Sequence, residues 1–147
     1  MEQLRRTMAL DVGEARVGIA LSDPLGLFAQ PLCTIERKSG QLFENLIIIV
    51  KEHNVKTIVI GYPYELDGSV GLQAKKVELF SNELKNIISI LETCPTIVYW
   101  DERFTSAQAE HLIMGSRLKN QDRRKALDKI AAAIILESYL QAKGNGS

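Results

Sequence analysis

The segment Thr57-Ile-Val-Ile-Gly61 constrains the fold most strongly, because it is a continuous apolar and β-branched run without a charged residue. A strand with one face in water alternates apolar and polar residues, whereas a continuous apolar strand needs cover on both faces. Gly61 and Pro63 end the run, so it is typical of a short strand rather than a helix. We therefore expect a sheet with helices on both sides.

The rest of the chain predicts how many strands and helices surround this strand. Two strands are expected over Thr7–Val12 and Arg16–Ser22, a third near Leu32–Glu36 and another buried strand over Thr96–Trp100. Helical spacing of apolar residues predicts helices over Gln41–His53, Gly71–Leu91 and about Gln121–Gln141, and a capping box at Thr105–Gln108 predicts one over about Ser106–Gly115. This order predicts an α/β fold, a ribonuclease H-like mixed five-stranded sheet flanked by helices. Residues 1–141 are expected to form this domain and residues 142–147 a flexible tail.

Composition narrows the class of protein further. The 147 residues fit one domain, and 18 Lys and Arg balance 18 Asp and Glu, which argues against a protein that coats nucleic acid non-specifically. No apolar run approaches the roughly 20 residues of a membrane span, so we expect a cytoplasmic protein without a membrane partner. Cys33 and Cys94 are isolated in sequence and are interpreted as buried reduced thiols.

An aspartate inside the first apolar strand is the first candidate functional residue. Strands are poor in Asp because its carboxylate is costly to bury, so Asp11 either forms a turn with Gly13 or serves a function. Asp101 and Glu102 directly follow the strand that ends at Trp100, at an edge where open α/β sheets place their sites. Strand alternation puts these two acids on opposite faces and leaves open which one turns inward.

Asp128 is the fourth candidate, because it lies on the apolar face of the last expected helix. It shares that face with Ala132, Ile135 and Tyr139, and its alternative role is an ion pair with Arg124 one turn earlier. Carboxylates that meet from a strand, a strand end and a packed helix suit Mg²⁺ or Mn²⁺, hard ions that also bind phosphate oxygens. We expect phosphodiester hydrolysis with catalytic residues Asp11, Asp101, Glu102 and Asp128, and with Asp11, Glu102 and Asp128 as metal ligands.

Cations near these acids are candidates for contact with nucleic acid. Arg16, with Gly13 and Gly18 letting the hairpin backbone approach, could contact a phosphate; its alternative is an exposed arginine. Arg103 could clamp the scissile phosphate or pair with a neighbouring acid. The run from 117 to 125 holds five cations and one anion, and is either a track for a nucleic-acid backbone or a solvated face. Its expected contact residues are Arg123 and Arg124, together with Lys129.

The chain resembles a known family through motifs spread from Ala9 to Leu140. They are Asp11-x-Gly13-x-x-Arg16-x-Gly18-x-Ala20-x-Ser22-Asp23, Ala29-x-Pro31-Leu32, Gly61-x-Pro63, Asp67-Gly68-Ser69, Trp100-Asp-Glu-Arg-Phe-Thr-Ser106 and Asp128-Lys-Ile-Ala-Ala132. Their order and spacing are similar to those of the YqgF family of RuvX-type, Holliday-junction-resolvase-like proteins, also called pre-16S rRNA nucleases.

The resemblance implies a ribonuclease H-like fold and a divalent-metal nuclease that matures the 5′ end of 16S rRNA, with precursor 16S rRNA or a pre-ribosomal particle as partner. It carries the acidic roles onto Asp11, the Asp101-Glu102 pair and Asp128. One departure from the broader ribonuclease H-like pattern is that the strand beside the first ends in Gly61-Tyr62-Pro63, without an acid. The second carboxylate must therefore come from Asp101 or Glu102.

Three alternative functions remain open from sequence. Sugar kinases and actin-like ATPases begin with a similar Asp-x-Gly hairpin but need two such domains. A non-catalytic RNA- or ribosome-binding module would keep the fold without the chemistry. A Holliday-junction resolvase acting on branched DNA in recombination or repair would need a stable dimer, whereas we expect a monomer or a weak homodimer.

Overall fold

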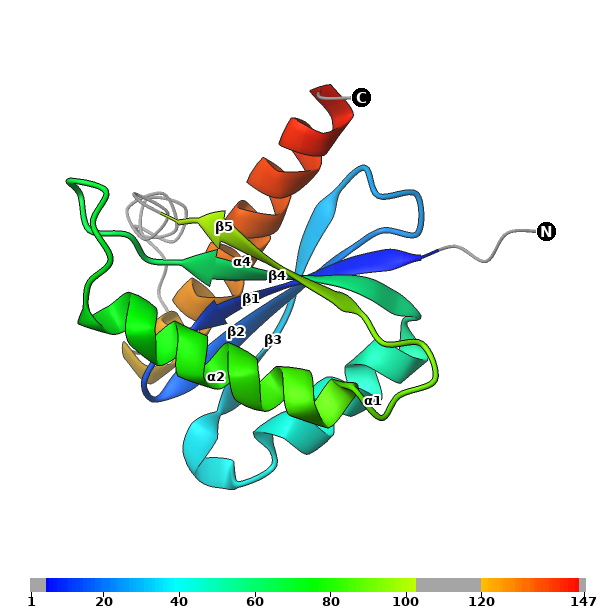
Figure 1. Ribbon diagram of the computed structural model, residues 1–147, viewed down its shortest axis with the longest axis horizontal. Coiled ribbons are helices and arrows are strands. Elements are labelled where there is room, and N and C mark those ends of the chain that lie inside the picture. Colours follow the sequence, from blue (N-terminus) through cyan, green and yellow to red (C-terminus); the bar gives the residue numbers. More distant parts are fainter. Residues whose placement is uncertain (1–4, 103–119, 146–147) are drawn as a thin grey trace.

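Five strands form one sheet in the order β3-β2-β1-β4-β5 in the computed structural model, which describes residues 5–102 and 120–145 (Figure 1). The strands are β1 (Arg6–Val12), β2 (Arg16–Ser22), β3 (Ala29–Glu36), β4 (Val55–Tyr62) and β5 (Thr96–Asp101). The helices are η1 (Arg37–Ser39), α1 (Leu42–Glu52), α2 (Leu72–Ile88) and α4 (Asn120–Asn145).

The central strand β1 pairs antiparallel with β2 and parallel with β4. On the outer sides of the sheet, β3 is antiparallel to β2 and β5 is parallel to β4. The mixed five-stranded sheet expected from the sequence is therefore confirmed. Its parallel half brings the carboxyl ends of β1, β4 and β5 to one edge, which is where the acidic residues follow.

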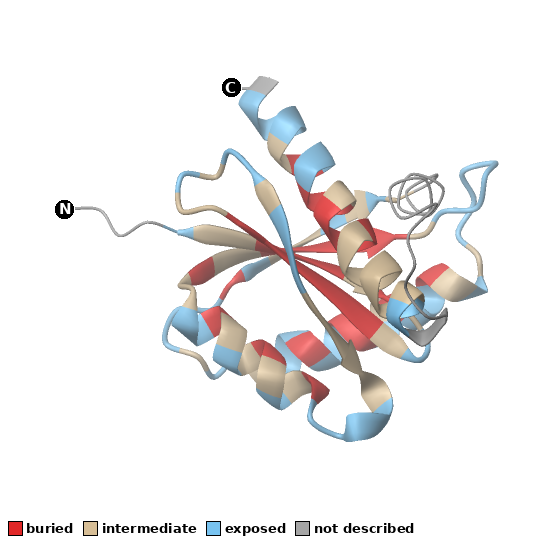
Figure 2. Ribbon diagram, turned by 180° about the vertical axis from the view of Figure 1, so that it is seen from behind, coloured by how far each residue is buried: buried red, intermediate tan, exposed pale blue. Residues whose placement is uncertain are grey.

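Helices α1 and α2 cover one face of the sheet, and α4 covers the other (Figures 1 and 2). Side chains alternate along β1 between these two layers. Met8, Leu10 and Val12 belong to the core under α1 and α2, whereas Ala9 belongs to the core under α4. Asp11 follows the alternation and faces α4. The strand that holds this acid is therefore fully covered, with its carboxylate on the α4 side.

Small residues on the α4 side let this helix lie close to the sheet. Ala9 and Ala20 are fully buried there against Ala132. At Gly18 the helix lies so close to the strand that a Cβ atom on this residue would collide with the backbone carbonyl of Asp128. The absence of a side chain at Gly18 therefore fixes where α4 crosses β2, and with it the position of Asp128.

Several expected elements differ from the structure. β5 is an edge strand with Thr96, Tyr99 and Asp101 exposed, not a strand buried on both faces, because no other described strand pairs with its outer side. β3 begins earlier than expected, at Ala29. The last helix continues past Gln141 to Asn145, where Lys143 lies over the Tyr139 ring. The helix expected over Ser106–Gly115 lies outside the described residues.

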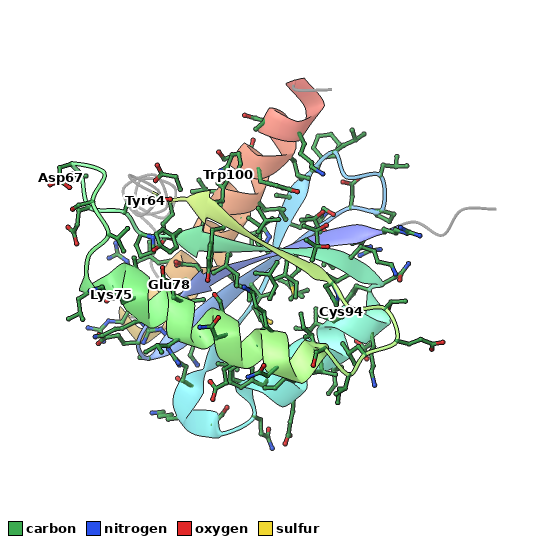
Figure 3. The ribbon with its side chains drawn as sticks, in the orientation of Figure 1. Tyr64, Asp67, Lys75, Glu78, Cys94 and Trp100 are labelled. Atoms are coloured by element: carbon green, nitrogen blue, oxygen red, sulfur yellow. The ribbon has the colours of Figure 1, made fainter. Side chains whose placement is uncertain are left out.

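Two expectations from composition can also be compared with the structure. Cys33 is partly buried, but Cys94 is exposed, so the interpretation of both as buried thiols was wrong for Cys94 (Figure 3). The turn that holds Cys94 links α2 to the edge strand β5, which leaves it open to solvent. In the part of the chain that the structure describes, no helix combines the length and the apolarity needed to cross a membrane.

Candidate functional site

Asp11 and Glu102 meet at the carboxyl edge of the sheet. Their carboxyl groups share a hydrogen bond, in which Glu102 donates to Asp11. The backbone N–H of Glu102 donates to the carbonyl of Tyr62 at 3.3 Å, which holds Glu102 just beyond the end of β5. The Glu102 side chain lies over Gly61, where a Cβ atom would collide with its carboxylate. Because Gly61 has no side chain, the Glu102 carboxylate can cross the end of β4 and reach Asp11.

Asp128 approaches the same site from the helix side. Asp11 is paired in register with Gly18, the residue against which the backbone of Asp128 packs. Arg16 lies two residues earlier on β2, and its Nε donates to Asp128 Oδ2 at 2.6 Å. The side chains of this ion pair are 27% and 22% exposed, so both are shielded from much of the solvent. The partner of Asp128 is thus Arg16 and not Arg124.

Burial dominates the electrostatics of the two acids in contact. It raises the pKa of Asp11 above its usual range, a shift opposed by the hydrogen bond from Glu102 and increased by the charge of Asp128. Burial raises the pKa of Glu102 as well, and the neighbouring charge of Asp11 raises it further. A shared proton relieves the repulsion between two carboxylates in a poorly solvated place. The pair of carboxylates therefore strongly favours binding a proton or another cation.

The structure separates the two acids that the sequence could not distinguish. Glu102 points to the α4 side with Asp11, while Asp101 is exposed and, by strand alternation, shares the face of Tyr99 on the α2 side. The charge of Asp101 adds to the rise in the pKa of Glu102. The expectation that Asp101 lies among the catalytic carboxylates does not agree with this position.

The cations expected to contact nucleic acid have different surroundings. Arg16 is engaged by Asp128, and Arg103 lies outside the described residues. On α4, Arg123 is partly buried and Arg124 is exposed. Lys129 lines a cavity of about 420 Å³ between β3 and α4. The other residues that line this cavity are Leu32, Cys33, Thr34, Asp122, Lys125 and Ala126.

Sequence reasoning missed the roles of two glycines. Gly18 was interpreted as a place where a phosphate could approach the hairpin, but the group that approaches is α4. Gly61 was interpreted as a strand end, and it is also the space that the Glu102 carboxylate fills. The available signal was a glycine within or at the end of an apolar strand, which often marks close approach of another group.

The donor set of this site fits a hard divalent cation. Two oxygens bound to one Mg²⁺ at about 2.1 Å and at a right angle lie about 3 Å apart, which is also a hydrogen-bond separation, as between Asp11 and Glu102. All the donors are carboxylate oxygens, the type that Mg²⁺ and Mn²⁺ prefer. Within residues 5–102 and 120–145, however, no three acidic, His or Cys side chains converge on one point as ligands. Asp128 is turned to Arg16 instead.

The sheet order, the packed last helix and the acids at the ends of β1 and β5 define a protein of the ribonuclease H-like class. The chain belongs to the RuvX family, described as Holliday junction resolvase, whose pattern matches residues 5–142. This membership makes it a hydrolase that acts on nucleic acid and confirms the resemblance to YqgF and RuvX proteins.

Relatives from several bacteria support the family assignment. The chain is 41% identical to a Syntrophus aciditrophicus protein named "Putative pre-16S rRNA nuclease" over 93% of this chain and 89% of the relative. It is 40% identical to a protein of the same name from Caldanaerobacter subterraneus, over 95% of this chain and 99% of the relative.

Two solved structures have the same fold at low sequence identity. Thermus thermophilus RuvC, solved with a Holliday junction substrate, has a TM-score of 0.60 at 13% identity and covers 97% of this chain and 98% of its own. The yeast mitochondrial Holliday junction resolvase Ydc2 has a TM-score of 0.51 at 11% identity and covers 98% of this chain and 81% of its own. These similarities confirm the ribonuclease H-like fold.

Proposed function

We propose that this chain hydrolyses phosphodiester bonds of RNA with the help of Mg²⁺ or Mn²⁺, and that its substrate is precursor 16S rRNA or a pre-ribosomal particle in the cytoplasm. The observation that carries the proposal is the contact between the Asp11 and Glu102 carboxyl groups across Gly61. The names of the relatives support RNA as the substrate.

Asp11 and Glu102 would hold the cation, and Asp128 would join them after its release from Arg16. A bound divalent cation lowers the pKa of an attacking water and stabilises charge on the phosphate oxygens. The chain's own residues position these groups. β1 fixes Asp11, the Tyr62 carbonyl fixes Glu102, and the contact at Gly18 fixes Asp128.

Arg16 is the side chain best placed to couple substrate binding to the acids. Its guanidinium can bind either a carboxylate or a phosphate oxygen with similar geometry. A substrate phosphate that attracts Arg16 would leave the Asp128 carboxylate available to the cation. In this proposal Arg16 is a positioning residue as well as a phosphate contact. Contacts of nucleic acid with Arg103, Arg123, Arg124 and Lys129 remain predictions.

A cleavage assay tests the proposal. The purified protein is incubated with Mg²⁺ or Mn²⁺ and precursor rRNA, single-stranded RNA or a four-way DNA junction. We expect cleavage of RNA that is lost in Asp11→Asn and Glu102→Gln and kept in Asp101→Asn, the matched control from the other face. Full activity of Asp11→Asn would refute the assigned site. Cleavage of the junction alone would support the resolvase alternative described for the family, and binding of RNA without any cleavage would support a non-catalytic module.

A further inference from the structure

Three tyrosines form a ring cluster on the α2 side of the carboxyl edge. The tyrosine cluster consists of Tyr62 and Tyr64 at the end of β4 and Tyr99 on β5. Tyr62 is the centre, with ring centroids 4.7 Å from Tyr64 and 5.0 Å from Tyr99. Tyr62 is 5% exposed, whereas Tyr64 and Tyr99 are each 37% exposed. The cluster therefore presents two aromatic rings to solvent on a buried third one.

The hydrogen bonds around Tyr62 make this cluster rigid. Its hydroxyl donates to Glu78 Oε1 on α2 at 2.6 Å, and its carbonyl accepts the backbone N–H of Tyr64 at 3.0 Å. The loop beyond Tyr64 is closed by the N–H of Glu65, which donates to the Ser69 carbonyl at 2.9 Å. Figure 3 shows Tyr64 near the ends of β4 and β5, with Glu78 on the adjacent part of α2. Rings already held in place lose little entropy when a ligand binds.

The cluster and the acid pair are joined through one peptide unit. The carbonyl of Tyr62 that positions the Tyr64 backbone also accepts the N–H of Glu102. Tyr62 is paired in register with Asp101, the residue before Glu102. The acid pair faces α4 and the tyrosine cluster faces α2, so a nucleic-acid strand that passes over the carboxyl edge would bring a nucleotide next to a phosphate held at Asp11 and Glu102 to the exposed rings.

The charged groups nearest the tyrosine cluster do not form a phosphate site. Glu78 accepts the Tyr62 hydroxyl, the carboxylates of Glu65 and Asp67 in the adjacent loop are turned to Gly71 and Ser69, and Lys75 lies on the first part of α2 (Figure 3). The flat face of a base carries no net charge and stacks on tyrosine whatever its sequence. Within a strand, an unpaired base can turn its face out of the stack, whereas a base inside a duplex is stacked on both sides. We propose that the tyrosine cluster is a stacking site for an unpaired base adjacent to the scissile phosphate, so that the substrate is single-stranded at the cleavage point; this rests on the proposed function.

A binding experiment that does not depend on cleavage tests the stacking site. The Asp11→Asn protein is titrated with a single-stranded RNA that carries 2-aminopurine, and with a blunt RNA duplex, at fixed salt. Adding Tyr64→Ala or Tyr99→Ala should weaken single-strand binding by about 5- to 150-fold, the range expected for loss of one base–aromatic stack. The fluorescence change of 2-aminopurine should also be reduced, and duplex binding should stay the same.

Matched variants separate stacking from folding. Tyr64→Phe and Tyr99→Phe keep the ring and should keep the affinity and the fluorescence change. Leu66→Ala removes a 75% exposed aliphatic side chain from the same loop and should change neither. Unchanged single-strand affinity in both alanine variants, or an equal loss for single strand and duplex, would overturn the stacking site. If single-strand binding depends on the rings but wild-type protein cleaves no RNA, the stacking site stands and the proposed hydrolysis fails.

Discussion

Arg16 and Asp128 are 112 positions apart in sequence, and the Arg16 guanidinium donates to the Asp128 carboxylate at 2.6 Å. The pair joins β2 to α4 beside Gly18, where the helix backbone packs directly on the strand. One cation from the hairpin thus neutralises the only acid that α4 brings to the described site. The charge state of the site depends on where this guanidinium is bound.

Arg16→Ala should lower the free energy of unfolding by about 1–2 kcal/mol, because it leaves a partly buried carboxylate without its charged partner. Urea denaturation at pH 7 measures the loss. Lys38→Ala is the control, since Lys38 pairs with Glu36 at 3.8 Å with an 84% exposed side chain and should change little. In the double variant with Asp128→Ala part of the loss should be recovered, and equal effects of Arg16→Ala and Lys38→Ala would argue against a stabilising pair.

Stability should fall as the pH rises through the range where the acid pair ionises. The pKa values of Asp11 and Glu102 are raised in the folded chain, so from about pH 4 upward the folded state binds more protons than the unfolded state. The free energy of unfolding therefore decreases with pH through the folded-state pKa values. Asp11→Asn and Glu102→Gln each remove one of the two ionising groups. The free energy of unfolding of each variant, relative to that of wild type, should therefore be higher at pH 8 than at pH 5.

Thermal midpoints measured with a chelator at both pH values test this. Asp67→Asn serves as the control, because the hydrogen bonds from Ser69 lower the pKa of Asp67 and its ionisation is favoured in the folded state. A pH dependence that is the same in wild type and both acid-pair variants would show that the pair does not titrate in this way.

Gly18 and Gly61, which both pack against other residues, should respond differently to substitution by alanine. At Gly18 the new methyl group meets the helix backbone at Asp128, so α4 must shift and we expect a loss of about 2–3 kcal/mol in unfolding free energy. At Gly61 it meets the Glu102 carboxylate and, at 2.7 Å, Ile135 Cδ1, which are side-chain ends that can move. Gly61→Ala should therefore cost less stability while reducing cleavage strongly.

Denaturation midpoints and initial cleavage rates are measured for both glycine variants. Gly144→Ala is the control, because a Cβ atom there has nothing within 4 Å. A larger stability loss for Gly61→Ala than for Gly18→Ala would contradict the packing described.

The sequence predicted the fold well because the pattern of apolar residues is set by the layers. Thr57–Gly61 is a run covered on both sides, and it lies in the buried strand β4 between the two helical layers. The edge position of β5 could not be predicted, since Thr96–Trp100 is equally apolar in sequence and only the pairing order exposes it. The last helix extends past the expected Gln141 to Asn145, and the contact of Lys143 with the Tyr139 ring exists only in the formed helix.

The site was predictable in part. The acids Asp11 and Asp128 could be identified because a carboxylate in an apolar strand or on an apolar helix face is costly without a partner. The orientation of Glu102 against Asp101 could not, since it depends on the space at Gly61. The partner of Asp128 depends on the crossing point of α4 at Gly18, a tertiary contact that sequence spacing does not encode.

Salt dependence tests the cations of α4. Removing Arg124 and Lys129 together by alanine substitution should weaken RNA binding at low salt. It should also reduce the slope of log affinity against log salt by about 1–2, because fewer phosphate contacts release fewer counterions on binding. Fluorescence anisotropy at several salt concentrations gives the slope. Lys85→Ala with Lys51→Ala, on the helices of the other layer, is the matched control of equal charge. An unchanged slope in the α4 variant would assign those residues to a solvated face.

Divalent cations should raise the thermal midpoint of the wild-type chain more than that of Asp11→Asn. A ligand that binds only the folded state stabilises it by RT ln(1 + [L]/Kd), about 2.7 kcal/mol at a hundredfold excess over Kd. Asp11→Asn removes one of the two acids in contact and should remove most of this shift, whereas Asp101→Asn, on the opposite face, should keep it. Scans are run with Mg²⁺, Mn²⁺ and a monovalent salt at equal ionic strength, because screening alone changes the repulsion between carboxylates. An equal shift in wild type and Asp11→Asn would mean that the cation binds elsewhere, and Asp11 would then be explained by its contact with Glu102 alone.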